Sequence, residues 1–354
     1  MKIDNTPKLD FDDVLLVPQR SMAASRQDVE LTRTFKFYHS PKEWRGVPLM
    51  AANMDATGTF KMGTVLSIHQ MITCLHKHYD GEEIEGYFKY YNVESDVWIT
   101  IGMDLEYELE RLHQISISCG FSPNICIDIA NGYTERFIDY CAKIRLEFPD
   151  SIIMAGNVCT PEMVSELILH GEVDIVKVGI GPGSACTTRL KTGVGYPQLS
   201  AIAECAHVAH GLRSDSGRLG LVCADGGCRT AGDVAKAYAA GADFVMLGGM
   251  LSGTDQGGGE VTDGYVQFYG MSSTESQRRN SNVKDYRASE GRVVRVSHKG
   301  SVEPIIRDVM GGLRSTCTYV GASALKELPK RTTFVRIASG DTHNRIYESS
   351  TTGE

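Results

Sequence analysis

The feature that most constrains the fold is a series of eight short apolar segments, each ending in small or polar residues and each followed by helical patterning. The eight segments span residues 47–52, 72–75, 97–101, 125–128, 152–155, 175–178, 220–223 and 244–247. Near-continuous apolar strands that alternate with helices are typical of a parallel sheet covered by helices. Because eight such strands close on themselves, the sequence predicts an α/β fold of the (β/α)8 TIM-barrel type.

Polar and glycine residues cluster directly after these predicted strands. The clusters are 53–55, 76–78, 128–131, 156–157, 179–189, 225–227 and 248–249. In TIM barrels the loops at the carboxyl ends of the strands carry the active site. Packing alone does not explain polar residues at all of these points, so we expect a functional site at this end of the barrel.

Residues 1–340 are expected to form one catalytic barrel domain, since α/β barrels often exceed the usual domain length. Residues 253–300 depart from the strand–helix rhythm and are rich in Gly, Ser and Arg. Long irregular stretches in compact domains are usually either functional or disordered. We therefore predict a flap over the barrel mouth at about 253–300, a final helical region at 307–328, and a flexible tail at 341–354.

Composition excludes several classes of function. The net charge of −8 provides no basic field for nucleic acid or an anionic membrane. The longest apolar runs fall short of 18 residues, and residues 1–13 carry four aspartates without an apolar core, unlike a signal peptide. The ten cysteines are scattered without a CxxC spacing and are expected to be reduced. These features predict a cytoplasmic protein with small-molecule ligands.

Cys186 is the strongest candidate for a nucleophile. It lies in the glycine-rich loop 179–189, after an apolar strand and three residues before Arg189. The loop is not a dinucleotide fingerprint, because the third glycine is missing and Pro182 interrupts the turn. An electropositive, partly exposed setting favours the reactive thiolate. The alternative is a small buried cysteine in a structural turn, which the loop and the neighbouring hydroxyls disfavour.

Two glycine pairs after the seventh and eighth strands predict a phosphate site. They are Gly226-Gly227, preceded by Asp225, and Gly248-Gly249. In TIM barrels the loops after strands 7 and 8 supply backbone N–H groups to phosphate. Asp225 is suited to ribose hydroxyls. The alternative is a pair of tight turns without a ligand.

Two charged residues are weaker candidates. Lys77 lies between His76 and His78 and is suited to a phosphate or a carboxamide, or is a solvated loop residue. The two histidines could bind a metal, but no third ligand with suitable spacing is evident. Glu290, in the predicted flap, is a candidate for acid–base work, although most such charges are solvated.

The string GIGPGSACTTR, with DGG and LGGM further on, resembles the IMP dehydrogenase/GMP reductase family. The finer match is to its GMP reductase branch, through AANMDATGTF, HKHY, IDIANGY, KTGVGYPQLSA, FYGMSS, YRASEG and STCTYVGA. The likeness extends over about residues 3–336. It implies a (β/α)8 barrel, here without the regulatory CBS insertion of IMP dehydrogenase.

The resemblance implies NADPH-dependent reductive deamination of GMP to IMP with release of ammonia, a step of purine nucleotide salvage. Cys186 would attack purine C2 and form a covalent thioimidate. Thr188 and Glu290 would relay protons to the leaving amine. The family is homotetrameric, so some contacts would come from a neighbouring subunit.

Ligand contacts are implied at matching positions. The GMP set is Ser184, Asp225, Gly226, Gly227, Gly248, Gly249, Gly270, Met271, Ser272, Arg287, Ala288, Ser289 and Gly291. The NADPH set is Ser25, Arg26, Lys77, Asp128, Ile129, Ala130, Ile180, Gly181, Met271, Tyr286, Arg287, Ser315, Thr316, Cys317 and Thr318. Carbonyl oxygens of Gly181, Gly183, Cys186 and Arg189 would bind K⁺.

Two alternative functions fit parts of the same pattern. IMP dehydrogenase uses the same thiol to hydrate its substrate, but the missing insertion and a flap without an Arg-Tyr pair disfavour it. A non-catalytic purine-binding barrel would keep the glycines and lose the reactive residues, all three of which are present. Two segments depart from the family pattern. Residues 21–25 are less basic than that pattern, and the segment 213–219, before the seventh strand, is longer than usual in the family.

Overall fold

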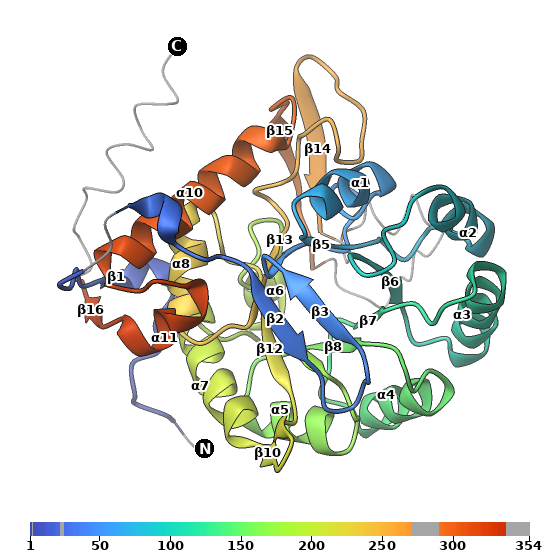
Figure 1. The fold of residues 1–354 in the computed structure, drawn as a ribbon, viewed down its shortest axis with the longest axis horizontal. Coiled ribbons are helices and arrows are strands. Elements are labelled where there is room, and N and C mark those ends of the chain that lie inside the picture. The colour runs from blue at the N-terminus through green and yellow to red at the C-terminus, as the bar shows by residue number, and fades with distance from the viewer. Residues whose placement is uncertain (2, 22–24, 271–272, 274–289, 338–354) are drawn as a thin grey trace.

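Eight parallel strands form a closed barrel in the computed structural model, which describes residues 1, 3–21, 25–270, 273 and 290–337. The order around the barrel is β12-β13-β4-β5-β6-β7-β8-β9 (Figure 1). The strands are β4 (Leu49–Ala51), β5 (Ile72–Cys74), β6 (Val97–Ile101), β7 (Ile125–Asp128), β8 (Ile153–Val158), β9 (Ile175–Val178), β12 (Leu221–Asp225) and β13 (Phe244–Leu247). Each predicted strand overlaps one of these, so the predicted (β/α)8 barrel is confirmed.

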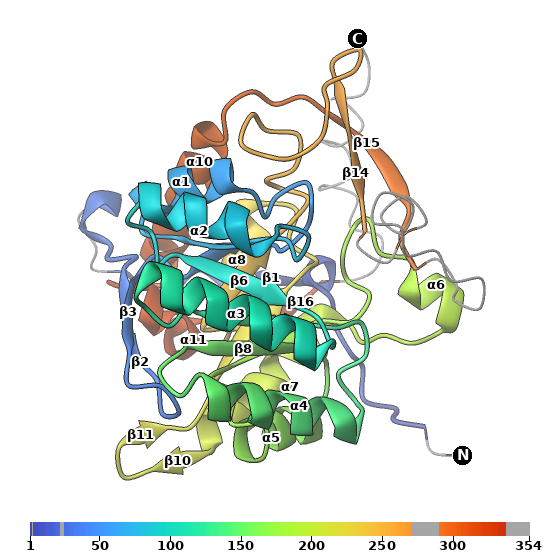
Figure 2. The same cartoon turned by 90° about the vertical axis from the view of Figure 1, so that its right-hand side faces the viewer.

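Helices surround the barrel and bury one face each against it (Figures 1 and 2). They are α1 (Phe60–Ile68), α2 (Gly81–Tyr90), α3 (Leu105–Cys119), α4 (Glu135–Glu147), α5 (Pro161–Leu169), α7 (Gln198–Gly211), α8 (Ala231–Ala239) and α10 (Glu303–Tyr319). Local sequence sets their ends: Thr230 and Asp233 form a capping box on α8, and Gly120 ends α3 at φ +76°. Among helices of the described ranges, none is long and apolar enough to cross a membrane.

The amino-terminal end of the barrel is closed by aromatic side chains. The hairpin of β2 (Arg33–Lys36) and β3 (Glu43–Gly46) carries Phe35 and Trp44. Their rings lie 4.5 and 5.5 Å from the ring of Phe244, at the start of β13. The long segment before β12 folds into a second hairpin, β10 (Arg213–Ser214) and β11 (Gly217–Arg218). This end is sealed, which leaves the opposite end for a ligand.

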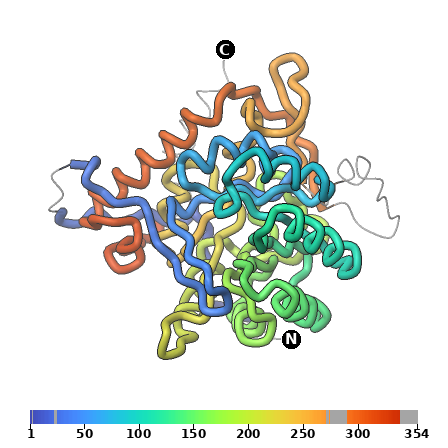
Figure 3. The backbone as a smooth tube through the Cα atoms, turned by 45° about the vertical axis from the view of Figure 1, so that its right-hand side comes forward, coloured from blue at the N-terminus to red at the C-terminus, as the bar shows by residue number. Residues whose placement is uncertain are grey.

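The two ends of the described chain pair with each other. After the short helix η1 (Phe11–Asp13), β1 (Val14–Leu16) runs antiparallel to β16 (Phe334–Arg336). The helices η2 (Arg26–Asp28), η3 (Leu325–Glu327) and α11 (Leu328–Arg331) complete this region. Figure 3 shows the blue amino-terminal segment beside the red carboxyl-terminal one.

The predicted irregular flap is partly regular. Within 253–300, β14 (Tyr265–Tyr269) pairs antiparallel with β15 (Val293–Ser297) to form a ribbon. Figure 2 shows this ribbon on the side of the molecule that also carries the short helix α6 (Thr188–Thr192), away from the β2–β3 hairpin. The expectation of an irregular stretch was wrong here because alternating burial along β14 marks a strand, a pattern that the glycine and serine content obscured.

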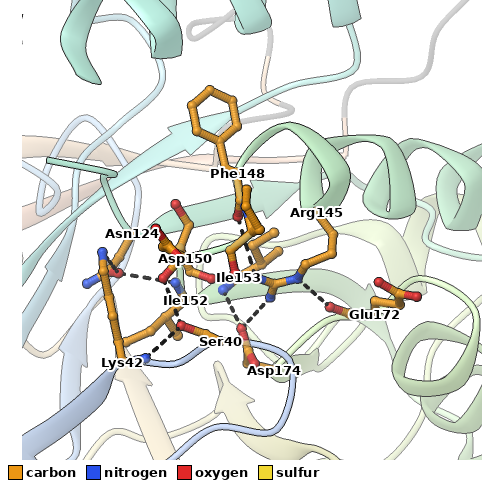
Figure 4. A network of polar contacts seen from close by, with 12 residues as sticks. Ser40, Lys42, Asn124, Arg145, Phe148, Asp150, Ile152, Ile153, Glu172 and Asp174 are labelled. Carbon is orange, nitrogen blue, oxygen red and sulfur yellow. Dashed lines mark hydrogen bonds and ion pairs between the residues drawn. The ribbon is translucent and has the colours of Figure 1, made fainter. Parts of the chain in front are cut away.

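A buried ion pair joins α4 to the starts of two barrel strands (Figure 4). The Arg145 guanidinium lies 2.6 Å from the Asp174 carboxylate, with 6% and 0% of the side chains exposed. Arg145 also donates to the carbonyl oxygens of Ser151 and Glu172, at 2.7 and 3.1 Å. Asp174 accepts from the backbone N–H of Ile153 at 2.8 Å. The pair therefore fixes β8 and β9 to the same helix.

Replacing Arg145 with methionine should lower the free energy of unfolding by about 3–5 kcal/mol, because it leaves the Asp174 carboxylate buried and unpaired. Urea denaturation at fixed protein concentration measures the change. Arg136→Met is a matched control, since Arg136 is an exposed arginine of the same helix and should change stability by less than about 0.5 kcal/mol. Equal effects of the two substitutions would contradict a structural role for the buried pair.

Candidate active site

The loop after β9 places Cys186 in a hydrogen-bonded chain with two other side chains. Cys186 Sγ lies 3.1 Å from Thr188 Oγ1, and the Thr188 hydroxyl donates to Glu290 Oε2 at 2.8 Å. Cys186 and Thr188 are half-buried at the start of α6, and Glu290 is half-buried beside them. The three residues predicted to be reactive are therefore in contact, although Thr188 and Glu290 are 102 positions apart.

Backbone contacts hold Glu290 against the loop. The Thr187 N–H donates to the Glu290 carbonyl at 2.8 Å, and the Arg292 N–H donates to the Ala185 carbonyl at 2.9 Å. Cys186 and Gly291 form an antiparallel bridge. A Cβ on Gly291 would lie 3.2 Å from the Cα of Gly270, so the end of β14 lies against the same segment. Backbone hydrogen bonds between residues 185–187 and 290–292 therefore hold Cys186, Thr188 and Glu290 together.

The glycine pairs after β12 and β13 approach the Cys186 loop closely. Gly226 and Gly227 both have φ of +88°, a conformation that side chains rarely adopt. A Cβ on Gly226 would meet Pro182 at 3.1 Å, and one on Gly249 would meet Ser184 Oγ at 3.1 Å. The structure therefore brings the predicted phosphate glycines to the loop of the predicted nucleophile.

A buried lysine that was not among the predicted site residues lies between two predicted ligand residues. Lys177, on β9, is 3% exposed and forms ion pairs with Asp128 and Asp225. Its ammonium also donates to Asn53 Oδ1 at 3.2 Å. Asn157 donates to Asp225 Oδ2 at 2.8 Å. The available signal was one charged residue within the otherwise apolar strand IVKV.

The loop is also braced from behind by Arg189. Its guanidinium donates to Asp10 Oδ2 at 3.1 Å and to the Tyr196 carbonyl at 2.5 Å. A Cβ on Gly181 would lie 2.5 Å from Arg189 Cγ, so glycine is required for this side chain to pass. Gln198 is fully buried and bonds the carbonyls that end β9 and β12. These contacts fix the loop without occupying its outer face.

Known proteins similar to this chain identify its family. A family model described as the IMP dehydrogenase / GMP reductase domain matches residues 99–348. GMP reductase of Aliivibrio salmonicida is 51% identical over 354 residues, which cover 98% of this chain and 99% of that protein. GMP reductases of Enterobacter sp. and Escherichia coli O81 are 51% and 50% identical, and each match covers 99% of this chain and 100% of the relative. The chain belongs to the IMP dehydrogenase/GMP reductase family.

Membership in this family of oxidoreductases makes the chain an enzyme. Its cysteines differ in burial and therefore in reactivity. All ten cysteines are free. Burial raises the pKa of Cys74, Cys205 and Cys223, so these thiols stay neutral and unreactive. Cys186 instead lies half-buried in a loop at the open end of the barrel. Within the residues that the structure describes, no group of three or more His, Cys, Asp or Glu side chains is placed to hold a metal ion.

The loop after β5 presents Lys77 to solvent, while the neighbouring His76 is half-buried. Burial lowers the pKa of His76 to about 4, so its imidazole is neutral at neutral pH. The ring stacks on Tyr79 with centroids 4.0 Å apart, and its Nδ1 accepts from the His78 N–H at 3.3 Å. His76 is therefore a packing residue, and Lys77 is the exposed cation of this loop.

Part of the predicted NADPH set lies in a separate place. Arg26 and Ser315 line a cavity of about 590 Å³ together with Gln27, Arg307, Asp308, Gly311, Gly312 and Arg314. In Figure 2 the blue segment that carries η2 lies on the opposite side of the molecule from α6. Two further cavity residues, the helical Arg307 and Arg314, were not predicted, because nothing in their spacing along the sequence indicates a shared cavity.

Two findings qualify the predicted ligand sets. The Cys317 side chain is fully buried, and it belongs to the same core cluster as Leu313, which lies four residues earlier in α10. Its thiol is therefore unavailable to a ligand, because positions four apart share one face of a helix. Six further predicted residues lie outside the described residues: Met271, Ser272, Tyr286, Arg287, Ala288 and Ser289.

Proposed function

We propose that this enzyme catalyses the NADPH-dependent reduction of GMP to IMP with release of ammonia. The observation that carries the proposal is the chain of Cys186, Thr188 and Glu290 at the open end of the barrel. It occurs in a protein about half identical to GMP reductases along almost its entire length. A purine-binding barrel without catalysis would not need a thiol hydrogen-bonded to a proton relay.

The GMP phosphate would bind where the glycine pairs meet Ser184. Backbone N–H groups free of side chains can converge on an anion there, and the Ser184 hydroxyl lies beside Gly249. Asp225, at the end of β12, would accept hydrogen bonds from the ribose hydroxyls. This placement would leave the purine above Cys186, with Gly270 and Gly291 beside the same loop.

The contacts among Cys186, Thr188 and Glu290 support a route by which an amine would become a leaving group. Cys186 sulfur would form a bond to purine C2 while the C2–N bond breaks. The thiol proton would pass through Thr188 to Glu290, and from Glu290 back to the departing amine, which leaves as ammonia. The product of this step is a thioimidate on Cys186. Covalent catalysis divides one difficult displacement into two easier steps, and the relay avoids release of an amide ion.

Bound NADPH would supply a hydride to C2 in the second step, which releases IMP and the Cys186 thiolate. One proton from solvent then restores the thiol, so the whole reaction consumes one proton. Asp128, Lys77 and the backbone of Ile129, Ala130, Ile180 and Gly181 would hold the nicotinamide end. The cavity with Arg26, Arg307 and Arg314 has the positive charge that a cofactor phosphate needs, and its distance from α6 favours binding to the cofactor of a neighbouring subunit in a homotetramer.

The Cys186 loop fits the monovalent cation that the family implies. Carbonyl oxygens are the donors that K⁺ takes in proteins, and the predicted set comes from Gly181, Gly183, Cys186 and Arg189. The required glycine at 181 lets the backbone curve tightly around this point. The Gly183 carbonyl accepts from the Cys186 N–H at 3.0 Å and keeps a second lone pair for an ion.

Absorbance at 340 nm tests the proposal. Adding GMP to the protein with NADPH should oxidise the cofactor and release one ammonia per cofactor. NADH formation from IMP and NAD⁺ as the main activity would instead indicate a dehydrogenase. Tight GMP binding with no turnover in the presence of K⁺ would indicate a non-catalytic binding protein.

A further inference from the structure

Lys177 is the most deeply buried cation next to the proposed ligand sites. It occupies the third position of β9, and its side chain points into the barrel beneath the site, with 3% exposed. Its ammonium contacts Asp128 at the end of β7, Asp225 at the end of β12 at 3.1 Å, and Asn53 after β4 at 3.2 Å. One side chain therefore links three segments of the barrel mouth.

The two carboxylates remain accessible while the lysine is not. Asp128 and Asp225 keep 24% and 20% of their side chains exposed. Each therefore turns one oxygen towards Lys177 and still presents surface to the barrel mouth. Since Lys177 is 3% exposed, it acts on a ligand through the side chains that it holds and not by direct contact.

Charge balance explains why a lysine is needed there. Two carboxylates that share a poorly hydrated site cannot both stay ionised without a cation, and one would take up a proton. Burial opposes ionisation of Asp128, but Lys177 outweighs it and lowers the pKa of that carboxyl. Burial likewise opposes the ammonium, but Asp128 and Asp225 raise the pKa of Lys177 well above its usual value.

The remaining groups near Lys177 cannot replace it. The thiols of Cys74, Cys126 and Cys223 face it from within the barrel. Lys77 acts on Asp128 from the exposed loop after β5. Lys77 is too exposed to balance the second carboxylate, because water screens its charge.

We propose that Lys177 is a positioning residue that joins the GMP and NADPH sites by holding Asp225 and Asp128 at once. This proposal rests on the proposed function, in which Asp225 contacts the ribose and Asp128 contacts the cofactor. Lys177 touches neither ligand, yet its removal weakens the binding of both GMP and NADPH. Without the ammonium the two carboxylates compete for one proton, and the carboxyl group that takes it accepts hydrogen bonds less strongly.

Calorimetric titration of Lys177→Met with GMP and, separately, with NADPH tests the proposal. Both dissociation constants should rise about tenfold or more at pH 7, as expected when hydrogen bonds to a charged group are lost. The GMP dissociation constant of the variant should fall as pH rises from 5.5 to 8, because the proton that the two neighbouring carboxylates share in the variant is then released. The parent protein should show a smaller change, which comes from titration of the GMP phosphate itself.

The double variant Lys177→Met/Asp128→Asn separates positioning from simple support of the fold. It removes the competing carboxylate, so GMP affinity should return to within about threefold of the parent while NADPH binding stays weak. If Lys177→Met does not fold, as judged by circular dichroism, Lys177→Gln removes the charge and keeps most of the side chain. Lys236→Met is a control, since Lys236 is a mostly buried lysine that bonds the Phe11 carbonyl away from this cluster.

Parental affinities in Lys177→Met, or loss of GMP binding as severe in the double variant as in the single one, would overturn the proposal. Failure of the proposed function is distinguishable, because the parent protein itself would then not oxidise NADPH in the presence of GMP.

Discussion

Replacing Cys186 with alanine should reduce GMP-dependent NADPH oxidation by on the order of 10⁴-fold or more. In the proposed mechanism the sulfur forms the bond that carries the purine between the two steps, and loss of a covalent nucleophile would remove that route entirely. The GMP dissociation constant should change by less than about threefold, because the proposed phosphate and ribose contacts lie on the glycine pairs and Asp225. Single-turnover absorbance and calorimetry measure the two quantities.

Cys119→Ala is the matched control for this substitution. Cys119 is also a partly exposed cysteine, at the end of α3, and its replacement should leave turnover near the parental rate. A Cys186→Ala variant that retains more than a few per cent of the parental rate would refute the covalent mechanism. Loss of GMP binding together with turnover would mean that Cys186 supports the shape of the loop.

Replacing Glu290 with glutamine should slow turnover by about 10²–10⁴-fold, the usual contribution of a general acid or base. Glutamine keeps the backbone carbonyl that accepts from the Thr187 N–H and the reach to Thr188, but it cannot carry the proton that the proposed relay delivers to the amine. The exposed Glu260 provides a control, and Glu260→Gln should leave the rate unchanged.

The reverse half-reaction locates the defect within the cycle. Mixing enzyme with IMP and NADP⁺ should give a burst of NADPH absorbance as the thioimidate forms, without any amine. This burst should survive in Glu290→Gln at a rate within about tenfold of the parent and be absent in Cys186→Ala. An undiminished steady-state rate in Glu290→Gln would remove Glu290 from the mechanism.

Local sequence was sufficient for the barrel and for the position of the nucleophile loop. The apolar run 97–101 coincides with β6, and the run 125–128 coincides with β7. Strand and helix periods depend on residues a few positions apart, so they can be read along the chain. The ribbon of β14 and β15 was missed because its composition resembled a loop more strongly than its alternation resembled a strand.

Side-chain chemistry between strands could not be read in the same way. Lys177 is one charged residue in an apolar run, and its role depends on two carboxylates that are distant in the sequence. Asp128 lies 49 positions before it, and Asp225 lies on β12, the neighbouring barrel strand. Arg307 and Arg314 gain significance only through the cavity they share with Arg26.

The sequence by itself determined that eight strands close into a barrel and that a thiol lies in a glycine-rich loop after one of them, because periodicity and turn chemistry are local properties. Only the tertiary structure decided that Cys186 reaches Glu290 through Thr188 and that one lysine serves two carboxylates. Those contacts join residues whose separation along the chain carries no information about distance until the barrel has closed and the backbone of residues 290–292 has paired with the loop.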